Sequence, residues 1–87
     1  MTYYVYVLKN TNKSRLTTYV GYTKNLKDRL RLHNKGAGAK FTRGRNWEII
    51  YYEKYPTKKE AISREYYIKK NRKIRDQIKE KFKWKKR

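Results

Sequence analysis

The stretch YVGYTKNLKDRLRLHNKG, residues 19–36, predicts the end of a β-strand followed by an α-helix. Its first residues are aromatic and β-branched, and Asn25 is a typical helix N-cap. Within the predicted helix, Arg29 and His33 are four residues apart and are therefore neighbours on one face. A guanidinium and an imidazole in that arrangement can act together on one small target, such as a phosphate.

The sequence on either side predicts two further strands. Residues 3–9 and 16–22 are rich in aromatic and β-branched residues and are separated by turn formers, so they predict a β-hairpin. Strand periodicity places alternate residues of the first strand on opposite faces: Tyr3, Val5 and Val7 on one, and Tyr4, Tyr6 and Leu8 on the other. Residues 47–55 predict a third strand, which Pro56 bounds.

Three helices complete the predicted order. The first follows Asn25, turns Leu26 and Leu30 to the core and ends near residues 34–36. Thr57 and Glu60 form a capping box that opens the second. The third is amphipathic, with apolar residues at i, i+4 and i+8: Ile74, Ile78 and Phe82. The order β-β-α-β-α-α is of the α+β class, in a single domain over residues 1–87 with a frayed basic tail at 83–87.

The charge of the chain points to its partner. The 87 residues include 26 Lys or Arg against 7 Asp or Glu, a net charge of +19. Such an excess destabilises the compact state by self-repulsion and is best explained by an anionic polymer, nucleic acid first. The absence of cysteine excludes disulfides, thiolate catalysis and cysteine-based zinc sites. With no signal-peptide pattern and no long apolar run, we expect a cytoplasmic protein without a membrane segment.

An ordered set of residues resembles the GIY-YIG nuclease domain: Tyr4-Val5-Tyr6, Tyr19-Val20-Gly21, Arg29 with His33, and Glu65. More closely, the chain is similar to the small stand-alone bacterial and archaeal proteins of that superfamily, over about residues 2–82. The resemblance implies a small central three-stranded antiparallel sheet flanked by helices. It also implies a DNA endonuclease that uses one divalent metal ion, Mg²⁺ or Mn²⁺.

The sequence departs from the family pattern at two places. Tyr4 stands where the name motif has glycine, a spacing position rather than a chemical one. The late asparagine of the family has no obvious counterpart, and Asn71 and Gln77 are the candidates.

Phosphodiester hydrolysis needs a base, positive charge for the phosphorane and stabilisation of the leaving oxygen. Tyr6 and Tyr19 are the candidate bases, provided that Arg29 and His33 supply positive charge that lowers the phenol pKa. Arg29 would stabilise the transition state, and His33 would accept a proton from Tyr6 or orient it. Glu65 falls beside the buried face of its helix and would hold the metal.

Plainer interpretations of these residues stay open. Strand tyrosines commonly serve packing, Arg29 is one cation among many, and Glu65 can pair with Lys69.

Basic residues predicted to contact nucleic acid are Lys24, Lys40, Arg43 and Arg45. Two functions follow: an endonuclease on DNA, with branched and single-stranded DNA as candidate substrates, or a binding module on the same scaffold that cleaves weakly or not at all. RNA stays an alternative ligand, and we expect a monomer or weak dimer.

Overall fold

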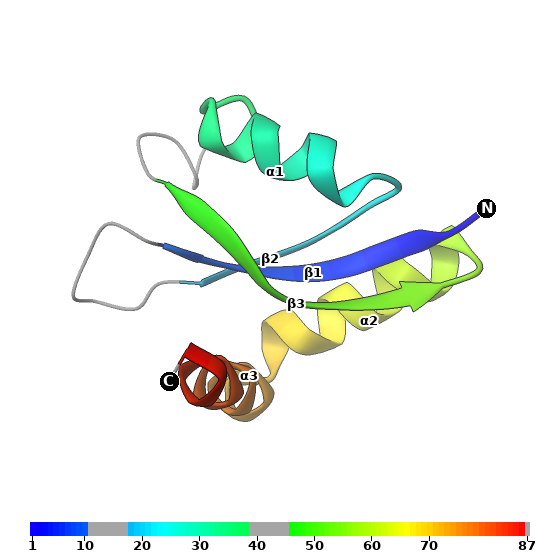
Figure 1. The fold of residues 1–87 in the computed structure, drawn as a ribbon. Helices are drawn as coiled ribbons and strands as arrows, with labels where there is room; N and C mark the ends of the chain where they lie inside the picture. The colour runs from blue at the N-terminus through cyan, green and yellow to red at the C-terminus, as the bar shows by residue number, and fades with distance from the viewer. Residues whose placement is uncertain (11–17, 39–45, 87) are drawn as a thin grey trace.

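The predicted order of strands and helices is confirmed. The computed structural model describes residues 1–10, 18–38 and 46–86, with side chains up to Lys81. The elements are β1 (Tyr3–Asn10), β2 (Thr18–Thr23), α1 (Leu26–Asn34), β3 (Trp47–Tyr55), α2 (Lys58–Lys70) and α3 (Arg72–Lys86). One sheet forms the middle layer, with α1 on one face and α2 and α3 on the other (Figure 1).

The sheet is antiparallel throughout, in the order β2-β1-β3, so β1 is its central strand. Tyr6 of β1 pairs with Gly21 of β2 on one side and with Tyr52 of β3 on the other. Between Val7 and Leu8 the register with β3 shifts by one residue, which is a β-bulge. The central position of β1 means that its side chains contribute to the packing on both faces.

Two hydrophobic clusters lie on opposite faces of β1, as its alternating pattern predicts. Val5 and Val7 pack with α2 and α3 residues on one face: Ala61, Ile68, Ile74 and Ile78. Tyr6 and Leu8 pack with Trp47 on the other face, beside the partly buried leucines of α1, Leu26 and Leu30. The sheet thus separates an aliphatic core under α2 and α3 from an aromatic core under α1.

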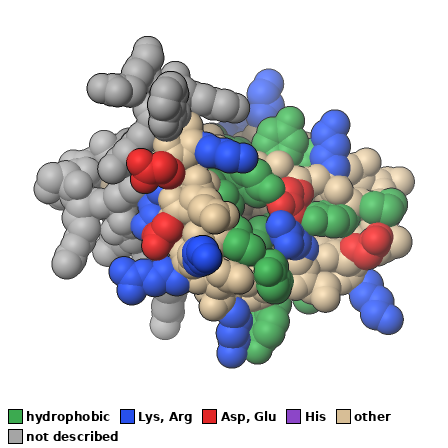
Figure 2. Space-filling model, turned by 90° about the horizontal axis from the view of Figure 1, so that it is seen from below, with side chains coloured by type: hydrophobic (Ala, Val, Ile, Leu, Met, Phe, Trp, Pro, Cys, Tyr) green, Lys and Arg blue, Asp and Glu red, His purple; other side chains and the backbone are tan. Residues whose placement is uncertain are grey.

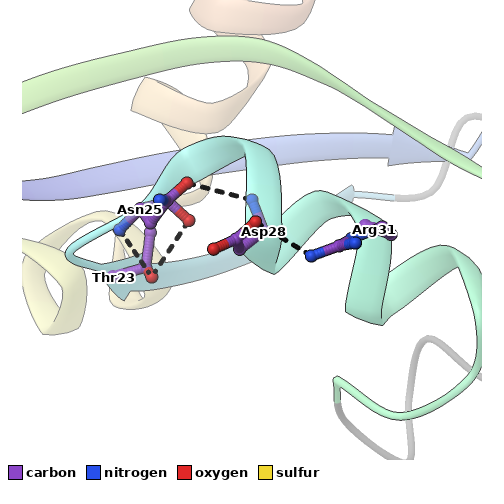
Figure 3. A network of polar contacts seen from close by, with 4 residues as sticks. All are labelled: Thr23, Asn25, Asp28 and Arg31. Atoms are coloured by element: carbon purple, nitrogen blue, oxygen red, sulfur yellow. Dashed lines mark hydrogen bonds and ion pairs between the residues drawn. The ribbon is translucent and has the colours of Figure 1, made fainter.

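Side-chain caps fix both ends of α1. The Asn25 Oδ1 accepts from the Asp28 backbone N–H at 3.0 Å, and the Asn25 N–H donates to the Thr23 hydroxyl at 3.2 Å (Figure 3). At the other end, Trp47 N–H donates to Asn34 Oδ1 at 2.6 Å and the Asn34 amide donates back to the Trp47 carbonyl at 3.2 Å. These bonds tie α1 to β2 and β3 and so fix the helix over the sheet.

The predicted pairing of Thr57 and Glu60 at the start of α2 is also confirmed, with the Glu60 carboxylate bound to the Thr57 hydroxyl in place of the Thr57 backbone N–H of a standard capping box. The Thr57 hydroxyl accepts from the Glu60 N–H at 3.2 Å and donates to the Glu60 carboxylate at 2.9 Å. The backbone of α3 is helical to Lys86, and the side chain of Phe82 lies outside the described ones, so its packing and the fraying at 83–87 stay predictions. Within the described residues, no helix has both the length and the apolar character needed to cross a membrane.

A cluster around Glu53 joins β3 to α2. The Arg64 guanidinium forms two hydrogen bonds to the Glu53 carboxylate, at 2.8 and 3.0 Å, and the hydroxyls of Tyr51 and Tyr55 donate to the same carboxylate. Burial by itself would raise the pKa of Glu53. The hydrogen bonds from Arg64, Tyr51 and Tyr55 outweigh burial, so the pKa lies below its usual value.

We expect Glu53→Gln to lower the free energy of unfolding by about 1 to 2 kcal/mol at pH 7, because it leaves Arg64 without its counter-charge. The folded-state pKa of Glu53 is lowered. The advantage of the wild type is therefore present above the unfolded-state value of about 4.3 and is lost as the pH falls through the folded-state value. Urea unfolding between pH 7 and pH 3 measures this difference.

Asp76→Asn is the matched control, because Asp76 forms exposed ion pairs with Arg72 and Lys79 on α3. Its loss should change the stability by less than about 0.5 kcal/mol. Equal effects of the two substitutions would contradict a special role for the Glu53 cluster.

Candidate active site

A pocket of about 520 Å³ collects residues from β1, β2, α1 and α2, and we call it the site pocket. Its lining consists of Tyr3, Tyr6, Tyr19, Gly21, Tyr22, Thr23, Lys24, Arg29, Lys58 and Glu65. The pocket therefore brings together five of the residues selected from the sequence: Tyr6, Tyr19, Lys24, Arg29 and Glu65. His33, also selected from the sequence, is hydrogen-bonded to the lining residue Tyr6 and is not in the lining itself.

Tyr6 and His33 form a buried polar pair. The Tyr6 hydroxyl lies 2.8 Å from Nε2 of His33, and the imidazole is fully buried. The ring of Tyr19 packs beside both, with its centroid 5.0 Å from that of His33 and 6.4 Å from that of Tyr6. The two tyrosines predicted from the sequence thus meet the only histidine of the chain at one edge of the pocket.

Gly21 makes room for this arrangement. A Cβ at Gly21 would lie 2.5 Å from the Tyr6 hydroxyl oxygen and 3.1 Å from a ring carbon of Tyr19. Since Tyr6 is buried among its neighbours, its rigid ring cannot move aside cheaply. The glycine of the Tyr-Val-Gly segment is therefore a steric requirement of the site.

The expected lowering of the Tyr6 pKa is wrong for the protein alone. Burial raises the pKa of the Tyr6 phenol well above its usual value and Tyr19 raises it further, whereas Arg29 opposes them only in part. Burial, followed by the positive charge of Arg29, lowers the pKa of His33. At neutral pH the pair is therefore a neutral phenol and a neutral imidazole, and His33 contributes no positive charge to Tyr6.

The neutral imidazole has a different chemical use. A phenol with a raised pKa gives up its proton only to an acceptor in hydrogen-bond contact, and Nε2 of His33 is at that distance. Which ring nitrogen carries the proton depends on the tautomer. The geometry suits proton transfer within the pair better than a free tyrosinate.

The positive charge of the site pocket comes from Arg29, Lys24 and Lys58. Arg29 is partly buried and acts electrostatically on both Tyr6 and His33, whereas Lys24 is exposed with its ammonium 5.8 Å from the Tyr3 ring centroid. Lys58, the first residue of α2, was missed in the sequence, because only the fold brings that helix end beside β2. Lys40, Arg43 and Arg45 lie outside the described residues, so their contacts stay predictions.

Among the described residues that line the site pocket, Glu65 is the only acidic one. Its side chain is 17% exposed and pairs with Lys69 at 3.2 Å, which is the ion pair expected from the plainer interpretation. Within the described part of the chain, no three His, Asp or Glu side chains form a metal-binding cluster. One hard carboxylate facing a water-accessible pocket fits Mg²⁺ or Mn²⁺, which commonly keep several water ligands.

Neither candidate for the late asparagine of the family lines the site pocket. Asn71 Oδ1 accepts from the Ile74 N–H at 3.2 Å and so caps α3. Gln77 lines a different pocket, together with Tyr51 of β3 and Ile78 of α3. The departure at Tyr4 is accommodated by packing, since its ring meets that of Tyr52 edge-on at 5.8 Å.

Comparison with known proteins agrees with the residue pattern. The family model described as the GIY-YIG catalytic domain matches residues 2–81. A UPF0213 protein of Clostridium perfringens is 52% identical over 68 residues, covering 77% of this chain and 70% of its own length. A second UPF0213 protein, from Oceanobacillus iheyensis, is 47% identical over 68 residues, covering 77% of this chain and 76% of its own.

A solved structure extends the similarity to the fold. The solution NMR structure of a UPF0213 protein from Bacillus halodurans has a TM-score of 0.52 and 35% sequence identity. The alignment covers 90% of this chain and 82% of that one. With the family model matching nearly its whole length, the chain belongs to the GIY-YIG family, whose domain is associated with endonucleases and whose small single-domain members include the UPF0213 proteins.

Proposed function

We propose that the protein is a divalent-metal-dependent endonuclease that hydrolyses DNA phosphodiester bonds. The observation that carries the proposal is the convergence of Tyr6, Arg29 and Glu65 on one pocket, with His33 hydrogen-bonded to Tyr6 behind it. Packing alone does not require a phenol, a guanidinium and a carboxylate from three different elements to share a cavity. Hydrolysis of a phosphodiester uses one group of each kind.

The buried pair supplies the base. A water molecule that attacks the phosphorus loses its proton to the Tyr6 oxygen while the Tyr6 proton passes to Nε2 of His33. The relay requires Nε2 to be the unprotonated ring nitrogen in the resting protein. The lowered pKa of His33 supports this role, because a neutral imidazole can accept a proton and an imidazolium cannot.

Arg29 and Glu65 would stabilise the negative charge that develops on the phosphate, Arg29 directly and Glu65 through a metal ion. The planar donors of Arg29 fit the phosphate oxygens and stay protonated throughout the reaction. Glu65 would hold one Mg²⁺ or Mn²⁺, which when bound polarises the phosphate and stabilises the leaving oxygen. The remaining cations of the site pocket, Lys24 and Lys58, would orient the strand through its flanking phosphates.

The surface outside the pocket also suits nucleic acid. On the side of α2 and α3, Lys and Arg side chains surround exposed hydrophobic ones (Figure 2). The exposed hydrophobic side chains of α2 are Ile62, Tyr66 and Tyr67. Lys70 lies 5.1 Å from the ring centroid of Tyr66, and Arg64 lies 5.1 Å from that of Tyr67. A polyanion that neutralises several of these cations gains affinity through counterion release.

The second candidate is a nucleic-acid-binding module that cleaves weakly or not at all. The Glu65–Lys69 ion pair and the capping role of Asn71 favour it, because both side chains already have partners within the fold. Binding alone would require neither a metal ion nor the Tyr6–His33 pair. Metal dependence of strand scission therefore separates the two functions.

The direct test is incubation with supercoiled, branched and single-stranded DNA and with RNA, each with Mg²⁺, with Mn²⁺ or with a chelator. We expect scission of DNA that appears with metal and is abolished by the chelator, since an unassisted phosphodiester is kinetically inert. Tight binding of all these substrates without metal-dependent scission of any would contradict the endonuclease and support the binding module.

Arg29→Ala should lower the cleavage rate by about 10² to 10³, because it removes a donor that acts on the charge of the transition state. DNA affinity should fall by only one phosphate contact, and Arg29→Lys should rescue poorly because an ammonium lacks the planar donor fork. Single-turnover cleavage and binding isotherms measure the two effects separately.

Arg31→Ala is the matched control, since Arg31 lies on the same helix but is 62% exposed and pairs with Asp28. It removes the same charge and should leave the cleavage rate within about 2-fold. A rate for Arg29→Ala no lower than that of Arg31→Ala would assign Arg29 to the solvated surface.

Glu65→Gln should abolish the metal response together with cleavage, because it keeps the shape of the side chain and removes the charge that holds the cation. DNA binding should persist or tighten, since a negative charge facing the phosphates is lost. Cleavage against metal concentration, DNA affinity and the metal-induced shift of the thermal midpoint are the measurements.

Lys69→Ala tests the same ion pair from its other side. It breaks the 3.2 Å contact but keeps the carboxylate. If Glu65 binds metal, Lys69→Ala keeps the metal response, whereas Glu65→Gln loses it. If the ion pair is the only role of Glu65, both variants lose a few tenths of a kcal/mol of stability and neither changes the metal response.

A further inference from the structure

We propose that Gly38 is a positioning residue of the site, whose missing side chain lets the backbone after α1 lie directly on the imidazole of His33 and hold that ring against Tyr6. Gly38 is not among the residues that line the site pocket. The effect of Gly38 on cleavage rests on the proposed function, because it requires the protein to be an endonuclease. The effect of Gly38 on the position of the imidazole holds whether or not the protein cleaves DNA.

The contact between Gly38 and the ring leaves no space for a methyl group. A Cβ at Gly38 would lie 2.4 Å from Nδ1, 2.7 Å from Cγ and 2.8 Å from Cε1 of His33. Because three ring atoms are approached at once, a small rotation of the imidazole would not relieve the overlap. His33 is fully buried and packs against the rings of Tyr6 and Tyr19, so the imidazole has no empty space to enter.

The end of α1 places Gly38 on the ring. Gly36 has a φ of 83°, a conformation that suits glycine, and its N–H donates to the His33 carbonyl at 3.1 Å. The Ala37 N–H donates to the Leu32 carbonyl at 2.8 Å, which completes a Schellman turn. The turn is therefore hydrogen-bonded to Leu32 and to His33 itself, which carries the imidazole. These bonds hold the backbone that leads to Gly38 close to the ring.

Gly38 and Gly21 thus contact the two members of the polar pair. Gly21 admits the Tyr6 hydroxyl, and Gly38 closes over the His33 ring to which that hydroxyl is bonded. Proton transfer within the pair requires the 2.8 Å separation of the two atoms, and an error of about 1 Å can cost about 100-fold in rate. A side chain at position 38 would therefore displace the imidazole from this separation.

The main experiment compares the wild type with Gly38→Ala and with Ala37→Ser, an exposed control in the same turn. Because His33 is the only histidine, its ring signals in ¹H–¹⁵N NMR report on the imidazole without ambiguity. We expect Gly38→Ala to shift these signals and to move the His33 pKa up towards its ordinary value of about 6.5. We also expect it to lower kcat about 10- to 100-fold with DNA affinity within about 2-fold, and Ala37→Ser to match the wild type.

A double-mutant cycle with His33→Ala separates this role from a general requirement for glycine. Removing the imidazole vacates the space that the new methyl group needs. Gly38→Ala should therefore lower the thermal midpoint clearly in the wild-type background and little in the His33→Ala background. If Gly38→Ala alone does not fold, a folded double variant still identifies the imidazole as the group with which the methyl clashes.

Any of three results would overturn the proposal. The first is unchanged His33 signals, pKa and cleavage in Gly38→Ala. The second is an equal loss of stability from Gly38→Ala in both backgrounds, and the third is a double variant that fails to fold where His33→Ala alone folds. If the protein cleaves no substrate, the proposed function fails, but the NMR signals and the cycle still decide whether Gly38 positions the imidazole.

Discussion

The hydrogen bond between the Tyr6 hydroxyl and Nε2 of His33 is the interaction on which the candidate site depends. It joins the central strand to α1 through two buried polar groups, each of which would be costly to bury without the other. Meeting this requirement constrains the neighbours as well. Position 21 of β2 must be a glycine, because a side chain there would overlap the Tyr6 hydroxyl. The caps of α1 must also hold that helix at a fixed position along the sheet.

Burial also decides the chemistry of the pair. The charge of the chain, +19, suggests a surrounding field that favours a tyrosinate, yet the pKa of Tyr6 is raised because its phenol is buried and lies beside another phenol. Desolvation acts on the site locally, whereas most of the lysines whose side chains the structure describes are exposed and screened by water and salt. Net charge therefore accounts for attraction of a polyanion, and the protonation states of the site follow from its immediate neighbours.

Local signals account for what the sequence predicted well. Alternation in β1, the N-cap at Asn25 and the capping box at Thr57 each involve residues a few positions apart, so the elements and their facing sides were predicted from the sequence. The bulge after Val7 and the approach of Lys58 to β2 arise from long-range packing and leave no local pattern. The direction of the Tyr6 pKa shift was missed for the same reason, because burial is a property of the assembled fold.

Whether the protein is an enzyme or a binding module depends on whether Glu65 binds a divalent cation or only forms its ion pair with Lys69. Its present partner, Lys69, is an i, i+4 neighbour that is 49% exposed, and pairs of this kind contribute about 0.3 to 0.5 kcal/mol. The Glu53 carboxylate, by contrast, accepts two hydrogen bonds from Arg64 and one each from the hydroxyls of Tyr51 and Tyr55. A contact as weak as the Lys69 pair would not keep Glu65 from holding a divalent cation, whose attraction for a carboxylate would be larger because of its double charge. The ion pair seen in the protein alone is therefore compatible with the proposed metal-binding role of Glu65.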